Sequence, residues 1–434
     1  MKKQILALLG ALLLLPGLAG CGRKETEPAA QKGVELSVVT SYGRDDGNRK
    51  SFEAAVASYE AKTGNRVLDG SSSSNEEWKN KVLTDFMTGS EPDVLFYFSN
   101  ADAEPFINAG RVVSIEEIRE EYPDYATNMK EAMMAVAADG RHYAVPSSGY
   151  WENLFVNRRV LEACGLPLPG PDYSWERFLS DCEVIRRAGY TPLACSLFEI
   201  PHYLFEFAVL NNGTLAGHLK VPQLDAQGRL IRDAAAESWI AALEDIRALY
   251  EAGFLPDNTL TATDAETVAL FAEGRAAFLI DGSWKVGYLS EYYADSLDDY
   301  VVSYVPGKGE RKATEAIGGI SMGYFITRKA WEDPLRREAA VAFVFHMTSE
   351  EVLSSFVTTE VTALIDGANP TGLNAIQQTA AETNANITGI VESVQDAISG
   401  EAKSELFADI QKCVTGQMSA EEAVEAAIRL NAEP

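Results

Sequence analysis

The sequence predicts an α/β protein of more than one domain, and three observations support this. Segments typical of strands and of helices alternate from residue 34 onward. The run at 94–98 is apolar throughout, as expected for a strand of a parallel sheet that is covered on both faces. The chain has 434 residues, which is more than a single hydrophobic core usually serves, so two or three domains are expected.

The first elements are expected in the order strand, helix, strand, helix, strand. The run at 34–42 is rich in valine, and a helical pattern of apolar residues follows it until Gly64, a typical helix stop. A short strand near 66–70 and a second helix then lead to the strand at 94–98. Such crossovers place the strands in parallel, and ligands of parallel sheets bind beyond the carboxyl ends of the strands. We therefore expect binding residues directly after residues 42 and 98.

A second group of elements is expected after residue 151. Its first helix starts at Ser174, a typical N-cap residue, and the strand-like run 191–197 follows this helix. The remaining expected elements are a helix from Ser238, a helix opened by the capping box of Thr263 and Glu266, strands at 276–284 and 301–307, and helices beyond 370 that end with one capped by Ser419.

The N-terminus predicts an exported lipoprotein. Two lysines precede an apolar run from Ile5 to Leu15, which is the layout of a secretory signal peptide and is too short to span a bilayer permanently. The ending Leu-Ala-Gly-Cys resembles a bacterial lipobox, in which Cys21 receives a diacylglycerol that anchors the protein. We expect a signal peptide at 1–20 and a lipidated flexible tether at 21–33. The alternative is a plain cleavage site with an accidental cysteine.

Charge and cysteine content exclude some classes of protein. The formal net charge of −27 argues against nucleic acid or an anionic lipid surface as partner. The cysteines other than Cys21 match no zinc motif and form no C-x-x-C pair, and the four histidines are scattered, so no metal site is expected. Cys182 lies on the apolar stripe of a predicted helix, which favours a buried free thiol. A disulfide between Cys182 and Cys195 is the alternative that the sequence leaves open. The remaining two cysteines are Cys164 and Cys413.

The stretch from Gly319 to Gly323 matches G-x-S-x-G, the nucleophile elbow of α/β-hydrolases, with Ser321 as the serine. That elbow requires a helix directly after the serine. Here Gly323 is followed by Tyr-Phe-Ile-Thr, another strand-like run, and the only downstream histidine is His346, within an apolar helical segment. The sequence therefore predicts that Ser321 is not a nucleophile.

Five longer stretches stand in an order that is typical of one family. They are EPDVLFYF (91–98), GYWENLFVNRRVLEACGL (149–166), SWERFLSDCEVIRRAGYTPLA (174–194), FAEGRAAFLIDGSW (271–284) and IGGISMGYFIT (317–327). Together they resemble the extracellular solute-binding proteins of bacterial ABC importers, in particular the carbohydrate-binding group that includes maltose-binding protein. The similarity covers nearly all of residues 34–430.

The resemblance implies a two-lobed periplasmic-binding-protein fold. Each lobe would be a mostly parallel sheet flanked by helices, and hinge strands would join the lobes around the ligand. It places lobe one at 34–147 and 281–327, and lobe two at 148–280 and 328–434. The small residues near Gly319 would let the backbone pass close to the other lobe.

The resemblance also implies the function. The protein would capture a mono- or oligosaccharide by hinge closure and deliver it to an ABC permease and its ATPase, without catalysis and without a cofactor. It would be a monomer, anchored by its lipid on the outer side of the cytoplasmic membrane. Sugars present hydroxyl groups to polar side chains and C–H faces to aromatic rings. The expected ligand contacts are Tyr42, Arg44, Asp45, Asp46, Asn100, Asp102, Tyr150, Trp151, Glu152, Glu199, His202, Tyr203, Asp281, Trp284, Gly318, Gly319 and Asp366.

Alternatives stay open at two levels. Single residues can have other roles: Trp151 and Trp284 can fill the hinge, Asp45 and Asp46 can be solvated turn residues, and His202 can lie in the core. Trp175 and Trp239 are expected in helix cores, and Tyr97 and Phe98 in the sheet interior. The whole chain could bind a peptide, a polyamine or a metal with the same fold. It could also be a secreted glycosidase with paired carboxylates, or a structural lipoprotein or adhesin.

Overall fold

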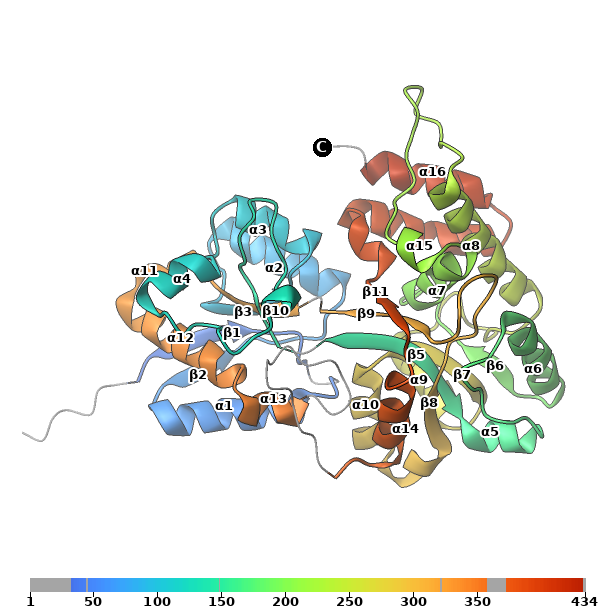
Figure 1. Ribbon diagram of the computed structural model, residues 1–434, viewed down its shortest axis with the longest axis horizontal. Helices are drawn as coiled ribbons and strands as arrows, with labels where there is room; N and C mark the ends of the chain where they lie inside the picture. Colours follow the sequence, from blue (N-terminus) through green and yellow to red (C-terminus); the bar gives the residue numbers. More distant parts are fainter. Residues whose placement is uncertain (1–32, 44–45, 148, 321, 357–371, 432–434) are drawn as a thin grey trace, which may run out of the picture.

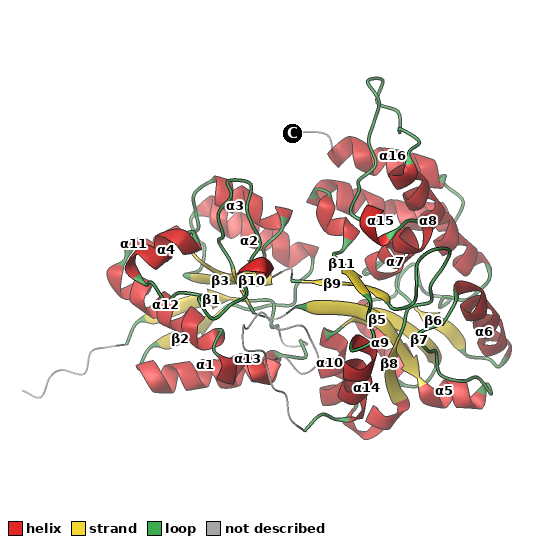
Figure 2. Ribbon diagram, in the orientation of Figure 1, coloured by secondary structure: helices red, strands yellow, loops and turns green. Residues whose placement is uncertain are grey.

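The computed structural model describes residues 33–43, 46–147, 149–320, 322–356 and 372–431. The chain folds into two lobes, each built on one β-sheet with helices on its faces (Figure 1, Figure 2). This confirms the predicted fold class. The expected signal peptide and all of the expected tether up to residue 32, with Cys21, lie outside the described residues.

The sheet of lobe one has the strand order β2-β1-β3-β10-β4. Strand β1 pairs in parallel with β2 and β3, as predicted, and β10 runs antiparallel to β3 and β4. Its strands are β1 (Glu35–Val39), β2 (Arg66–Asp69), β3 (Val94–Phe98), β4 (Val145–Pro146) and β10 (Met322–Ile326). Its helices are α1 (Arg49–Thr63), α2 (Glu76–Thr88), α3 (Glu104–Asn108), α4 (Ile115–Glu121), α11 (Arg328–Glu332), α12 (Pro334–Met347) and α13 (Glu350–Phe356), with short 3-10 turns η1 (Ala101–Ala103) and η2 (Glu131–Met133).

The sheet of lobe two has the order β11-β9-β5-β7-β6, with β8 also paired to β5. Here the expectation of a mostly parallel sheet is wrong, because the central strand β5 runs antiparallel to β7, β8 and β9. Only β6 with β7 and β11 with β9 are parallel pairs among the described strands of this sheet. The strands are β5 (Tyr150–Asn157), β6 (Thr191–Ala194), β7 (Ala276–Gly282), β8 (Tyr300–Ser303), β9 (Glu315–Gly319) and β11 (Gly389–Val391).

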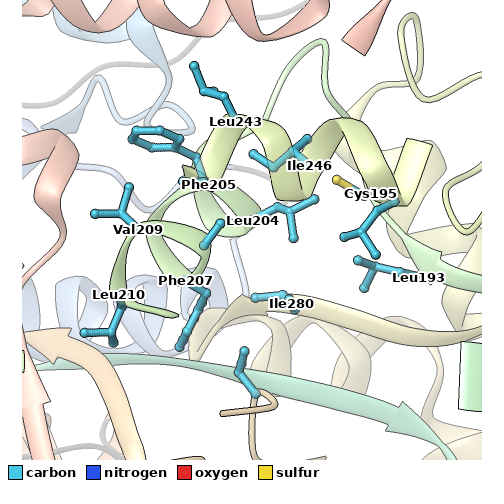
Figure 3. Close-up of a cluster of buried hydrophobic side chains, with 14 of the residues drawn as sticks. Leu193, Cys195, Leu204, Phe205, Phe207, Val209, Leu210, Leu243, Ile246 and Ile280 are labelled. Atoms are coloured by element: carbon cyan, nitrogen blue, oxygen red, sulfur yellow. The ribbon is translucent and has the colours of Figure 1, made fainter. Parts of the chain in front are cut away.

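The helices of lobe two enclose its largest hydrophobic core. Side chains of α7 and α8 meet those of β6 and β7 there (Figure 3), and Trp239 of α8 is fully buried, as predicted. Helix α8 starts at Ala234, four residues earlier than expected, and Asp233 provides its cap. The helices are α5 (Arg158–Ala163), α6 (Trp175–Arg187), α7 (His202–Asn212), α8 (Ala234–Glu251), α9 (Asp264–Ala272), α10 (Trp284–Tyr292), α14 (Ala375–Asn384), α15 (Gly400–Val414) and α16 (Ala420–Asn431), with the turns η3 (Leu215–Gly217), η4 (Ala294–Asp299) and η5 (Val394–Ala397).

The expected lobe boundaries need correction in the second half of the chain. Residues 281–319 belong to lobe two, because β7, β8 and β9 all pair with β5. Residues 328–356 belong to lobe one, because α11, α12 and α13 pack their apolar faces on the sheet that contains β10. The described parts of lobe one are therefore 33–147 and 322–356, and those of lobe two are 149–319 and 372–431.

The G-x-S-x-G stretch lies where the chain passes from β9 to β10. Ser321 itself is outside the described residues, but the next described element is strand β10 and not a helix, so this stretch does not lead into the helix that a nucleophile elbow requires. The glycines are required because there is no space for a side chain. A Cβ on Gly318 would lie 2.7 Å from the carbonyl oxygen of Tyr150, and a Cβ on Gly323 would lie 2.8 Å from the carbonyl oxygen of Val145. The backbones approach too closely for a side chain.

We expect Gly323→Val to destabilise lobe one by about 3 kcal/mol, because the added side chain must push β10 away from β4. The matched control is Gly400→Val, since nothing lies within 4 Å of a Cβ at that position. Urea unfolding followed by circular dichroism measures both. Equal stabilities of the two variants would contradict the close approach.

Two further features concern the whole chain. The cysteines at 164, 182, 195 and 413 are free thiols, so the disulfide that the sequence left open between Cys182 and Cys195 is absent. Within the described ranges, no helix has the length and apolar character needed to cross a membrane.

Candidate functional site

The two lobes are in contact between the loop after β1 and helix α10. A Cβ on Gly47 of lobe one would lie 2.6 Å from the backbone nitrogen of Tyr288 in α10 of lobe two, so the two backbones are in direct contact. Nearby, Lys50 forms an ion pair of 2.8 Å with Glu291. The side chains that lie where the lobes face one another define the candidate site.

Three aromatic residues of lobe two form the centre of this site. The ring of Trp284 lies 6.4 Å from that of Tyr150 and 6.0 Å from that of Tyr203. A Cβ on Gly282 would fall 2.1 Å from the Trp284 ring, so the missing side chain leaves room for the indole. All three residues are half-buried. We call Tyr150, Tyr203 and Trp284 the aromatic group.

Two carboxylates lie directly beside the aromatic group. Glu152 is on the same face of β5 as Tyr150, because side chains alternate along a strand, and Glu206 comes from α7, which covers that face. They are 2 % and 0 % exposed. Burial, together with the charge of Glu206, raises the pKa of Glu152, and burial with the nearby Asp396 raises the pKa of Glu206 to about 8. We call Glu152 and Glu206 the acid pair.

A lysine-centred cluster lies at the end of β7, next to α9 and α10. Lys285 is 2.6 Å from Asp264 and 3.7 Å from Asp281. Asp46 of lobe one lies near enough for Lys285 to act on its charge, yet burial dominates and raises the pKa of Asp46 to about 6. This cluster therefore joins charges of both lobes.

A second cluster with charges of both lobes lies near α7. In lobe one, Lys79 pairs with Asp102 at 2.9 Å and lies over the ring of Phe98, which is thus at the strand end and not in the sheet interior as expected. In lobe two, Lys403 pairs with Asp396 at 3.4 Å. The charge of Lys79 acts on both Asp396 and His202 across the interface.

His202 lies between rings in this second cluster. It packs against Tyr203 and stacks on Phe407. Burial, with Lys403 and Lys79 nearby, lowers the pKa of His202 to about 3, so its imidazole is neutral at physiological pH. A neutral ring can accept a hydrogen bond as well as donate one.

The structure brings together part of the residue set expected from the sequence. Asp46, Asn100, Asp102, Tyr150, Glu152, His202, Tyr203, Asp281 and Trp284 lie around the aromatic group or in the two clusters. Gly318 and Gly319 are at the end of β9, where Gly318 pairs with Trp151 and Gly319 with Tyr150. Arg44, Asp45 and Asp366 lie outside the described residues.

Three expected contacts have other places in the fold. Tyr42 is 6 % exposed and packs on Phe52, Phe96 and Phe356 in the core of lobe one. Trp151 points to the opposite face of β5 from Tyr150 and stacks on Phe155. Glu199 is exposed and accepts a hydrogen bond from the backbone of Asp264 at the start of α9. The first two are core residues, and the third stabilises a helix end.

Sequence reasoning missed several charged residues of the site. Glu206 had a visible signal, because it is a lone acid in the apolar aromatic segment HYLFEFAVL of α7. Lys285 follows Trp284 directly in the sequence, so the motif that indicated Trp284 could also have indicated Lys285. Lys79, Asp396 and Lys403 carry no such signal, because each lies on an ordinary amphipathic or loop segment and reaches the site only through the tertiary fold.

The raised pKa of Glu206 predicts a pH-dependent stability. Between about pH 5 and 8 the folded protein keeps a proton on Glu206 that the unfolded chain releases, so stability falls as pH rises through this window. Glu206→Gln cannot ionise. From pH 5 to pH 9 its stability relative to the wild type should improve by about 3 kcal/mol, measured by urea unfolding. The surface variant Glu251→Gln should show no such trend. If the difference in stability between Glu206→Gln and the wild type stayed the same from pH 5 to pH 9, this would contradict the burial of the Glu206 carboxyl group.

A bilobal α/β chain, with aromatic and acidic side chains gathered where its lobes face each other, has the architecture of a binding protein. The sequence pattern of the family described as bacterial extracellular solute-binding protein matches residues 54–383. The chain belongs to this family, which is exported from the cell. This confirms the resemblance seen in the five sequence stretches.

Solved structures agree with the fold. A chitin oligosaccharide binding protein is 19 % identical, with a TM-score of 0.76 over 92 % of this chain and 98 % of that one. The solute-binding protein RafE in complex with raffinose is 17 % identical, with a TM-score of 0.73 over 92 % and 100 %. The maltose/maltodextrin-binding domain MalE of Bdellovibrio bacteriovorus, bound to maltotriose, is 18 % identical, with a TM-score of 0.68 over 91 % and 98 %. No curated relative matches the chain by sequence.

Proposed function

We propose that this solute-binding protein captures a mono- or oligosaccharide between its lobes and delivers it, chemically unchanged, to the permease of an ABC importer. The observation that carries the proposal is the aromatic group with the acid pair beside it. A sugar ring needs both kinds of partner at once, since its C–H faces lie well on aromatic rings and its hydroxyl groups donate to carboxylates.

The family relationship supports the same conclusion. The similar proteins named above are a binder of chitin oligosaccharide, one in complex with raffinose and one bound to maltotriose. In this chain we place the ligand against the aromatic group, Glu152, Asp281 and His202 of lobe two. From lobe one we add Asp46, Asn100 and Asp102, which come from the loops after β1 and β3. The Nδ2 amide of Asn100 has no hydrogen-bond partner among the described residues and is available as a donor.

Binding would close the two lobes around the sugar. The charges that face each other across the interface, Lys79 with Asp396 and Asp46 with Lys285, favour the closed form and would separate on opening. The closed form is the one we expect the permease to recognise. A lipid on Cys21 would hold the protein on the outer side of the cytoplasmic membrane, near that permease.

The test is a calorimetric titration of the mature protein with a panel of mono- and oligosaccharides. We expect at least one sugar to bind with micromolar affinity or better, about 8 kcal/mol, and small-angle scattering to show a more compact protein in its presence. Chromatography of the recovered sugar should show no cleavage. Turnover of the sugar would establish an enzyme instead, and binding without compaction would contradict closure of the lobes.

A further inference from the structure

The acid pair differs from the other acids of the site in lacking a cation. Among the described residues, Asp281 and Asp264 share Lys285, Asp396 pairs with Lys403, and Asp102 pairs with Lys79. No lysine, arginine or histidine of the described ranges forms an ion pair with Glu152 or Glu206. Lys403 acts on Glu206 only from a distance, while Asp396 raises the cost of its charge.

The oxygens of the acid pair are also short of hydrogen-bond donors. Oε2 of Glu152 and both carboxylate oxygens of Glu206 are buried, and none of them has a partner in good hydrogen-bonding geometry within the described part of the chain. Their polar neighbours are each other and the Ser393 hydroxyl, which acts on Glu206. Burying a carboxylate without hydrogen-bond partners costs free energy. Such a group in a natural protein therefore calls for an explanation, and a bound ligand that donates the missing hydrogen bonds is one. Two adjacent carboxylates double this cost, because like charges repel in a medium of low dielectric constant.

The surroundings of the acid pair indicate what completes it. The hydroxyl groups of Tyr150 and Tyr203 lie close enough for Glu152 and Glu206 to act on both. Trp284 lies next to both tyrosine rings. Aromatic faces beside carboxylates attract a cation through the ring quadrupole as well as through charge. A primary ammonium group donates three hydrogen bonds, and the acid pair offers three unpartnered buried oxygens.

We propose that the sugar bound by this protein carries a free amino group, and that its ammonium lies between Glu152 and Glu206 while the ring stacks on the aromatic group. The inference rests on the proposed function and narrows it from carbohydrates in general to amino sugars. An ammonium group would supply the positive charge that lets the acid pair release its proton, whereas a neutral sugar meets a protonated pair and gains no charge-assisted contact, so it should bind more weakly in the same place.

Three trisaccharides with the same β-1,4-linked backbone provide the test. Chitosan triose carries an amino group at C2 of each ring, chitin triose an acetamido group and cellotriose a hydroxyl group. Calorimetry at pH 6.5 with the wild-type protein should show that chitosan triose binds at least tenfold more tightly than chitin triose or cellotriose. The monosaccharides glucosamine, N-acetylglucosamine and glucose should follow the same order.

Variants separate the acid pair from general electrostatic attraction. Glu206→Gln should lower the affinity for the aminated sugar at least tenfold while changing the affinity for a neutral sugar less than threefold. Glu152→Gln is the second variant if the first fails to fold, and Glu251→Gln on the exposed side of α8 is the control that keeps wild-type binding.

Each outcome decides the inference. Neutral or acetylated sugars that bind as tightly as the aminated ones overturn it and leave the proposed function standing. Spermidine that binds while no sugar does overturns both, since the site would then take an amine without a sugar ring. The absence of binding by all six probes also overturns the inference, and the wider sugar panel then decides the proposed function.

Discussion

Trp284→Ala is expected to weaken carbohydrate binding about a hundredfold, with the two lobes still folded. The indole lies over Gly282 and next to the rings of Tyr150 and Tyr203, so its loss removes the largest aromatic surface of the group on which a sugar ring can stack. A hundredfold loss corresponds to about 2.7 kcal/mol, which is within the range for removing a large aromatic contact. Calorimetric titration with the best ligand of the panel measures it.

The matched control is Trp175→Ala. Trp175 is also half-buried and lies in lobe two, but it packs on Phe178 at the start of α6, outside the two clusters. We expect this variant to bind as the wild type does. If Trp284→Ala kept full affinity, Trp284 would be a packing residue at the start of α10, and the aromatic group could not be the surface that binds the ligand.

Arg311→Ala is expected to lower the free energy of unfolding by about 4 kcal/mol, the largest stability effect we predict. Arg311 is 4 % exposed and donates to the carbonyl oxygens of Val305, Pro306 and Glu315. Burial lowers the pKa of Arg311 to about 9. Its removal leaves several buried acceptors without a donor, at about 1–3 kcal/mol each before the loop relaxes.

The comparison for this prediction is Arg232→Ala. Arg232 pairs with Glu237 and Glu421 on the surface, where such pairs contribute at most about 1 kcal/mol. Urea unfolding of both variants, monitored by circular dichroism, gives the two losses. Similar small losses would show that the loop between β8 and β9 tolerates rearrangement and that Arg311 is not essential to it.

Local sequence patterns predicted the elements of the fold well. Gly64 ends α1 in the left-handed conformation, Ser174 caps α6, and Thr263 with Glu266 forms the capping box of α9, all as expected. These features depend on residues close in sequence. The placement of β8, β9 and α11 to α13 was wrong, because lobe membership depends on which distant strand each element pairs with or packs against.

The candidate site shows the same division. Trp284 and Tyr150 were expected from the motifs around them, and both are in the aromatic group. Trp151 was expected as well, but one residue along a strand reverses the direction of a side chain, and the sequence did not indicate which of the two neighbours faces α7. Asp396 and Lys403 join the site from the last part of the chain, so no local pattern could connect them with Lys79.

The position of β10 has a consequence for biosynthesis. This strand lies between β3 and β4, so the first lobe lacks a central strand until residues 322–326 have left the ribosome, and lacks three covering helices until residue 356 has followed. A domain whose contacting parts are so distant in sequence folds slowly. For a secreted chain this delay is useful, since a polypeptide that stays open during synthesis can be threaded across the membrane before it becomes compact.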